Sequence, residues 1–163
     1  PLLERTLGEK RFLFYYITCG IGAALVQELV WQFTWKDIFA PMFANQAGWS
    51  MAEAHQALDM AIAQGQNIPA LNALLTVGAS GGIFGILLAF GMLFPNLPLY
   101  IMFIPVPIKA KYMVWGYGAI EFFFGISGTM SSVAHFAHLG GMLFGLLLLL
   151  YWKKKGNISG GIY

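Results

Sequence analysis

The chain has 163 residues, of which 58% are hydrophobic and 10% are charged. Soluble domains have about 25% charged residues, so this composition argues against a soluble globular protein and favours one that faces lipid. The net charge of +2 is too small to indicate a nucleic-acid partner. The single cysteine, Cys19, cannot form an intrachain disulfide, and its apolar surroundings predict a purely structural role.

Four segments are apolar enough to be membrane-spanning helices, which need about 20 residues each. They are residues 12–31, 68–94, 112–126 and 133–152. The sequence therefore predicts an all-α membrane protein, a polytopic bundle with four spans. We expect residues 1–163 to form a single membrane domain that is incomplete at its N-terminus, because the chain opens at Pro1 in the middle of a pattern.

Two stretches between these segments do not fit a straight membrane helix. Residues 95–108 are apolar but interrupted by prolines, which predicts an interfacial loop. Residues 35–67 are too polar to cross lipid, and Ser50 with Glu53 fits a capping box at the start of a surface helix. The apolar residues of that amphipathic helix recur near helical spacing: Met51, Ala54, Leu58 and Ile62.

The basic residues predict the orientation. If the four segments cross the membrane, eight lysines and arginines lie on one side and Lys36 lies alone on the other. The positive-inside rule makes the first side cytoplasmic, so both ends of the chain are expected inside and the 35–67 insert outside. The eight residues are Arg5, Lys10, Arg11, Lys109, Lys111, Lys153, Lys154 and Lys155.

A serine and a histidine are expected at the same depth in this topology. Ser80 follows the first few turns of the second span, and His138 lies near the outer end of the fourth. A serine hydroxyl needs a neighbouring base to become nucleophilic, and neutral imidazole is the usual one. The two helices can approach closely because small residues line both of them: Gly81 and Gly85 below the serine, Gly141 and Gly145 below the histidine.

Each of these residues is also compatible with a purely structural role. A Gly-x-Ser-Gly sequence in an apolar helix is by itself more often a packing motif, whereas a histidine inside a membrane span indicates function. His135 lies one turn before His138 and is expected to be interfacial or supporting. His55 in the polar insert is expected to be solvated, and Glu121 to be hydrogen-bonded inside the bundle or protonated rather than catalytic.

Two motifs and the opening of the chain resemble the rhomboid family of intramembrane proteases. Residues 78–81, GASG, resemble its GxSG motif, and residues 134–145, AHFAHLGGMLFG, resemble its AHxxHxxGxxxG motif. Residues 3–8 resemble the end of the family's second core helix, which makes the four spans core helices three to six. The resemblance implies hydrolysis of peptide bonds in or beside transmembrane segments of substrates, by a Ser80–His138 dyad without a catalytic acid, cofactor or metal.

The resemblance also implies what surrounds the dyad. The family carries a histidine and an asparagine on its second core helix that stabilise the oxyanion, and neither is in these residues, so we expect residues 1–163 alone to be inactive. Phe84 stands where some relatives have tyrosine, so its ring can stack on the histidine. The supporting and oxyanion residues are expected to be Gly78, Ala79, Gly81, Phe84 and His135, with the amide of Ser80 as the chief remaining donor.

The expected partners are transmembrane protein substrates and the lipid bilayer, and the expected location is a bacterial plasma (inner) membrane with a cytoplasmic C-terminus. Two alternatives remain. One is a non-catalytic rhomboid-like protein that binds membrane substrates, although such proteins usually lack the serine or histidine. The other is a small transporter or channel subunit that uses His138 and Glu121 as pathway residues, although the spans offer few further polar groups. The sequence leaves the physiological substrate and the oligomeric state open.

Overall fold

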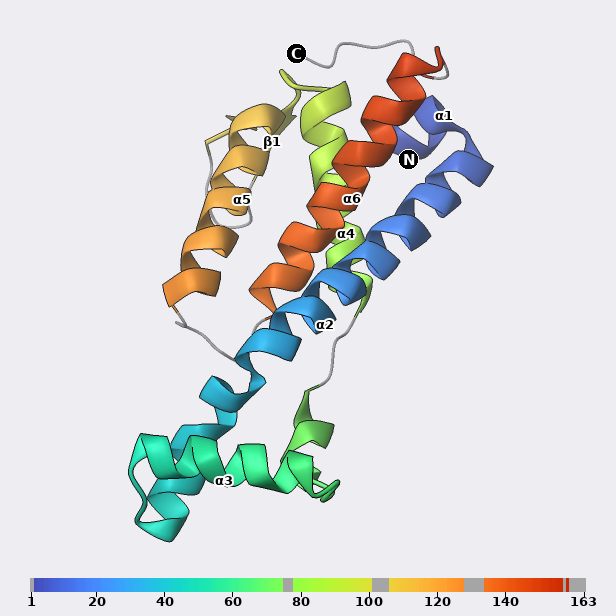
Figure 1. Ribbon diagram of the computed structural model, residues 1–163. Coiled ribbons are helices and arrows are strands. Elements are labelled where there is room, and N and C mark those ends of the chain that lie inside the picture. The colour runs from blue at the N-terminus through green and yellow to red at the C-terminus, as the bar shows by residue number, and fades with distance from the viewer. Residues whose placement is uncertain (1, 75–77, 101–105, 128–133, 157, 159–163) are drawn as a thin grey trace. The chain divides into compact units, whose positions relative to one another are not determined.

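A computed structural model describes residues 2–74, 78–100, 106–127, 134–156 and 158. The chain in these ranges is almost entirely helical (Figure 1), which confirms the predicted all-α class. It divides into two compact units. The main unit consists of Pro1–Gln27 and Val77–Tyr163, and the insert unit consists of Glu28–Thr76.

The described part of the main unit contains five helical segments. Helix α1 ends at Leu7, and the following Gly8 has a positive φ of 81°, the left-handed conformation that glycine adopts readily after a helix. The next helix, α2, runs on into the insert unit and contributes its residues up to Gln27 here. The bounds are α1 Leu2–Leu7, α2 Glu9–Ala47, α4 Gly78–Leu93, α5 Ala110–Ser127 and α6 His135–Lys154.

The insert unit consists of the rest of α2, helix α3 (Met51–Ala63) and a short 3₁₀ helix at Pro69–Ala73. The predicted capping box is present, because the Ser50 side chain accepts from the Glu53 amide and the Glu53 carboxylate accepts from the Ser50 amide. The second of these hydrogen bonds lowers the pKa of Glu53. On α3, Ala54 and Leu58 are buried as expected, whereas Met51 and Ile62 are exposed.

Two helix boundaries differ from the prediction. The first helix continues past residue 31 to Ala47, so residues 35–47 of the insert extend it. In the predicted span 68–94, Pro69–Ala73 forms a 3₁₀ helix and the described α-helix runs from Gly78 to Leu93, with residues 75–77 outside the described ranges. The two errors have different causes. The first helix continues although the sequence becomes polar at Lys36 and Asp37, whereas residues 68–74 are as apolar as α4 but adopt a different backbone conformation at Pro69–Ala73.

The predicted loop 95–108 contains a short hairpin-like pairing. Strands β1 (Pro98–Leu99) and β2 (Ile108–Lys109) are antiparallel, with Pro98 opposite Lys109 and Leu99 opposite Ile108. Residues 101–105 of that loop lie outside the described ranges.

Two helices of the described residues are long and apolar enough to cross a membrane, Glu9–Ala47 and His135–Lys154. A third apolar helix, Ala79–Leu93, is shorter. The expectation of four spans is therefore supported only in part, and the crossings by α4 and α5 stay a prediction.

Candidate active site

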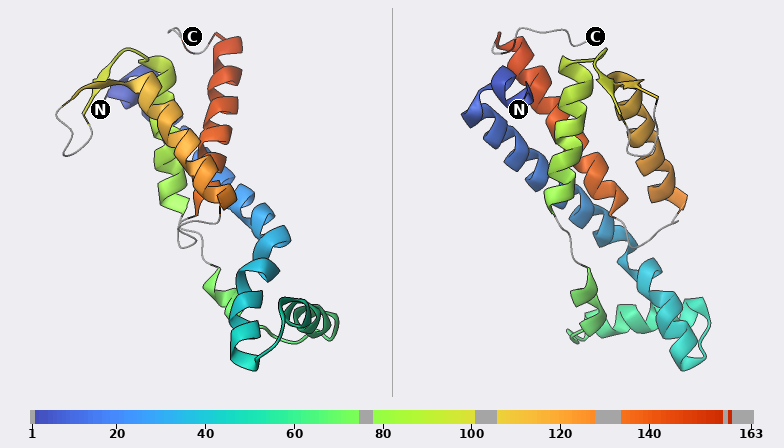
Figure 2. Two further views of the ribbon diagram at one scale, coloured as in Figure 1. Left: turned by 90° about the vertical axis from the view of Figure 1, so that its left-hand side faces the viewer. Right: turned by 180° about the vertical axis from the view of Figure 1, so that it is seen from behind.

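Helices α4 and α6 pack backbone against backbone at their glycines. A methyl group added to Gly141 would overlap the carbonyl group of Gly81, and one added to Gly81 would lie 3.1 Å from the Ala137 carbonyl oxygen. One turn further along α4, a methyl group on Gly85 would lie 3.2 Å from the carbonyl oxygen of Gly141. Residue numbers rise together on the two helices, so they run parallel, as Figure 2 also shows. The predicted close approach of these two helices is confirmed.

Helix α2 contacts the same glycine surface from the other side. The Cys19 side chain is fully buried against Gly85 and Gly145. The Tyr15 hydroxyl, also fully buried, donates a 2.7 Å hydrogen bond to the Gly85 carbonyl oxygen. Cys19 thus has the structural role expected of it. The packing role of Tyr15 escaped the sequence analysis, because an aromatic residue in an apolar run carries no sign of its partner.

Ser80 and His138 lie in the first turns of these two parallel helices. Ser80 is the third residue of α4 and His138 is the fourth residue of α6. Ser80 is therefore nearer the start of its helix than the several turns expected from the sequence. Gly78 and Ala79 form the beginning of the same turn of α4. Ser80 precedes Gly81, which contacts Gly141 and Ala137, and Ala137 is the direct neighbour of His138.

The ring of His138 lies over the face of α4 that carries Ser80. It stacks on the ring of Phe84 with a centroid separation of 4.0 Å and an interplanar angle of 8°. Residues four apart in a helix share one face, so Phe84 lies one turn below Ser80 on that face. The ring stacking expected for Phe84 is present.

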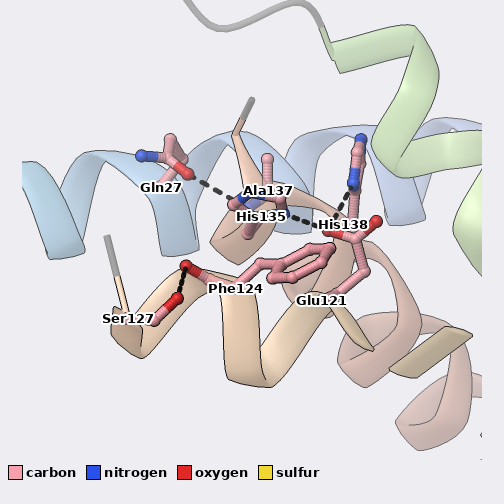
Figure 3. A network of polar contacts seen from close by, with 7 residues as sticks. All are labelled: Gln27, Glu121, Phe124, Ser127, His135, Ala137 and His138. Carbon is pink, nitrogen blue, oxygen red and sulfur yellow. Dashed lines mark hydrogen bonds and ion pairs between the residues drawn. The ribbon is translucent and has the colours of Figure 1, made fainter. Parts of the chain in front are cut away.

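A buried carboxylate joins the two histidines of α6 (Figure 3). Glu121, on α5, is 8% exposed, and its Oε2 lies 2.6 Å from His135 Nδ1 and 3.0 Å from His138 Nδ1. The first contact is a hydrogen bond, whereas the second is close in distance but lies outside hydrogen-bond direction. Glu121 is hydrogen-bonded inside the bundle, as expected. The His135 side chain is buried, with 6% exposure, and its interfacial or supporting role stays a prediction.

The start of α6 receives a second buried polar contact. The Gln27 side chain is 4% exposed, and its Oε1 accepts a 3.1 Å hydrogen bond from the Ala137 amide. The same amide also donates to the Ala134 carbonyl oxygen at 2.9 Å, so Gln27 adds a second acceptor in the first turn of the helix that carries both histidines (Figure 3). The sequence analysis missed Gln27. Its only signal was that it is a lone side-chain amide in an apolar segment.

The histidine of the insert unit, His55, has an acidic neighbour. His55 in the insert unit is not simply solvated, because its Nε2 lies 3.0 Å from Asp37 Oδ1. Within the described residues, no group of three or more histidine, cysteine, aspartate or glutamate side chains is arranged to hold a metal ion. The chemical roles of Ser80, His138 and the supporting residues stay predictions.

Comparison with known protein families matched residues 1–155 to a family model described as "Rhomboid domain". Comparisons with curated proteins and with solved structures gave no match.

Proposed function

Since this chain belongs to the rhomboid family, we propose that it is an intramembrane serine endopeptidase that cleaves transmembrane segments of other membrane proteins. The rhomboid-domain match and the long apolar helices indicate that it is an integral membrane protein. Ser80 is the nucleophile and His138 is its general base. Helices α4 and α5 are the second and third of four spans, and the C-terminus is cytoplasmic in a bacterial inner membrane.

The proposed reaction proceeds in two halves. The Ser80 hydroxyl attacks the scissile carbonyl carbon while His138 accepts the hydroxyl proton, which it then donates to the leaving amine. Water attacks the resulting acyl-enzyme with His138 again as the base, which releases the acid product and restores Ser80. Backbone amides at the start of α4, among Gly78, Ala79 and Ser80, point toward the N-terminal end of the helix, where a developing oxyanion is favoured.

One observation carries this proposal: the parallel ring stacking of His138 on Phe84. It supports a base on the same helix face as Ser80. The contact between Gly81 and Gly141 supports it independently, because it brings the two helix backbones together one residue after the serine and three after the histidine.

A serine-directed fluorophosphonate probe tests the proposal on the full-length protein in proteoliposomes. The probe reacts only with an activated serine, so we expect wild-type protein to be labelled and Ser80→Ala and His138→Ala to be unlabelled. Ser127→Ala is the matched control, because it removes another serine hydroxyl, one that donates to the Phe124 carbonyl oxygen of its own helix.

Each outcome separates the candidate functions. Labelling that depends on both residues excludes the non-catalytic rhomboid-like protein and the transporter. A folded wild-type protein that the probe never labels would exclude the protease. Labelling that survives Ser80→Ala would place the nucleophile elsewhere.

A further inference from the structure

The buried carboxylate of Glu121 is the third polar group of the site, and the dyad mechanism gives it no task. It projects from α5 toward α6 and places a single oxygen, Oε2, against the Nδ1 atoms of both His135 and His138 (Figure 3). Burying a carboxylate in an apolar bundle is costly unless it is paired or protonated. Packing alone does not explain why the Glu121 carboxylate lies beside Nδ1 of the proposed base, His138.

His135 fixes the position of that carboxylate. Its Nδ1 is 2.6 Å from Glu121 Oε2, the shorter of the two contacts, and both side chains are about nine-tenths buried, with exposures of 7% and 10%. The ring of Phe124, one turn along α5 from Glu121, lies 5.8 Å from the His135 ring, centroid to centroid. His135 therefore anchors Glu121, and His138 meets an oxygen whose place is already set.

His138 is held on two sides. Phe84 covers one face of its ring, and Glu121 Oε2 lies 3.0 Å from its Nδ1 edge. An acceptor at Nδ1 favours the neutral tautomer that carries its proton there, which leaves Nε2 with the lone pair. That is the tautomer a general base needs when the serine approaches Nε2. This 3.0 Å contact lies outside hydrogen-bond direction, so Glu121 Oε2 acts on the Nδ1 proton of His138 through its charge and not through an aligned hydrogen bond.

We propose that Glu121 is a positioning residue, which holds His138 in the tautomer with a proton on Nδ1 and opposes the charge of the imidazolium formed during catalysis. His135 is its anchor. The inference rests on the proposed function, because it assigns Nε2 of His138 to Ser80. In each half-reaction one proton moves from the attacking oxygen to Nε2 and then to the leaving group, and no proton passes through Glu121.

Probe-labelling kinetics on the full-length protein test the role of the carboxylate. Glu121→Gln keeps the shape of the side chain but removes its charge. It should slow the maximal labelling rate by at least about tenfold, and by less than the ~10⁴-fold lost when the aligned carboxylate of a serine-protease triad is replaced. The probe concentration at half-maximal rate should change by less than about twofold, because the probe's binding site is untouched. Glu9→Gln, an exposed carboxylate of the same unit, is the matched control and should label at the wild-type rate.

A second measurement does not depend on whether the glutamine variant folds. The ¹⁵N chemical shifts of the His138 ring in wild-type protein, assigned by their loss in His138→Asn, should show a protonated Nδ1 and an unprotonated Nε2 when the ring is neutral. The opposite tautomer would overturn the inference, as would a folded Glu121→Gln protein that labels at the wild-type rate. Wild-type labelling of Ser80→Ala would contradict the proposed function. Wild-type labelling of Glu121→Gln would contradict only the role of Glu121, so the two failures can be told apart.

Discussion

The rings of Phe84 and His138 lie 4.0 Å apart, centroid to centroid, and within 8° of parallel. One ring belongs to the helix of the proposed nucleophile and the other to the proposed base. A stacked pair of this kind contributes about 0.5–1.5 kcal/mol beyond the area it buries. It restricts the imidazole to a plane, so that motion toward or away from Ser80 occurs mainly within that plane.

The first prediction concerns this stacking. Phe84→Leu keeps an apolar side chain but removes the ring, so we expect the rate of probe labelling to fall about two- to tenfold, the rate equivalent of about 0.5–1.5 kcal/mol. Phe84→Tyr should retain nearly the full rate. The control is Phe90→Leu, which removes a ring from the same helix in a pair with Phe94. An equal loss of rate in both leucine variants would mean that the effect is one of stability and not of base placement.

The second prediction distinguishes the two histidines. His138→Ala should abolish cleavage of a transmembrane model substrate by the full-length protein, as should Ser80→Ala, because nucleophile and base act as one unit. His135→Ala should leave a measurable fraction, since it removes the anchor of Glu121 and not the base. Turnover is followed by gel separation of the products. Activity in His138→Ala together with none in His135→Ala would reverse the assignment of the base.

The sequence predicted the helix contact well and the polar cluster poorly, for a physical reason. Helical geometry puts Gly81 and Gly85 on one face whatever the neighbours are, so the close approach to Gly141 could be read directly from residue spacing. The meeting of Glu121 with His135 depends on the relative rotation and height of α5 and α6. The relative rotation and height of these two helices are set by packing along both of them, so they cannot be predicted from either segment alone.

The start of α4 illustrates the same limit. Residues 68–74 are as apolar as the helix that follows, so periodicity could not separate the 3₁₀ helix at Pro69–Ala73 from α4. Proline is favoured in the first turn of any helix, so Pro69 was compatible with an α-helix that begins at residue 68. Gln27 was missed because its acceptor role depends on the start of α6, which is distant in the chain.

The third prediction tests the helix contact with a matched pair of glycines. Gly141→Ala forces a methyl group into the Gly81 backbone, and overpacking of this kind costs about 1–3 kcal/mol. We expect a lower Tm and lost probe labelling. Gly116→Ala in α5 adds the same group where no atom outside the adjacent helix backbone lies within 4 Å, and it should be neutral or stabilise by up to ~1 kcal/mol through helix propensity. Equal unfolding midpoints in detergent for both variants would show that the helices need not approach so closely.

The fourth prediction concerns orientation in the membrane. The basic residues place the C-terminal lysines in the cytoplasm and Lys36 outside, so single cysteines introduced at Lys36 and at Lys154 should react with a membrane-impermeant maleimide from opposite sides. The unmodified protein is the control, because its only cysteine in these residues, Cys19, is fully buried and should not react. Labelling in intact cells is compared with labelling after permeabilisation. An odd number of crossings between the two positions requires opposite sides. Reaction of both cysteines from one side would therefore exclude the four-span topology and remove the reason for placing Ser80 and His138 near the outer face.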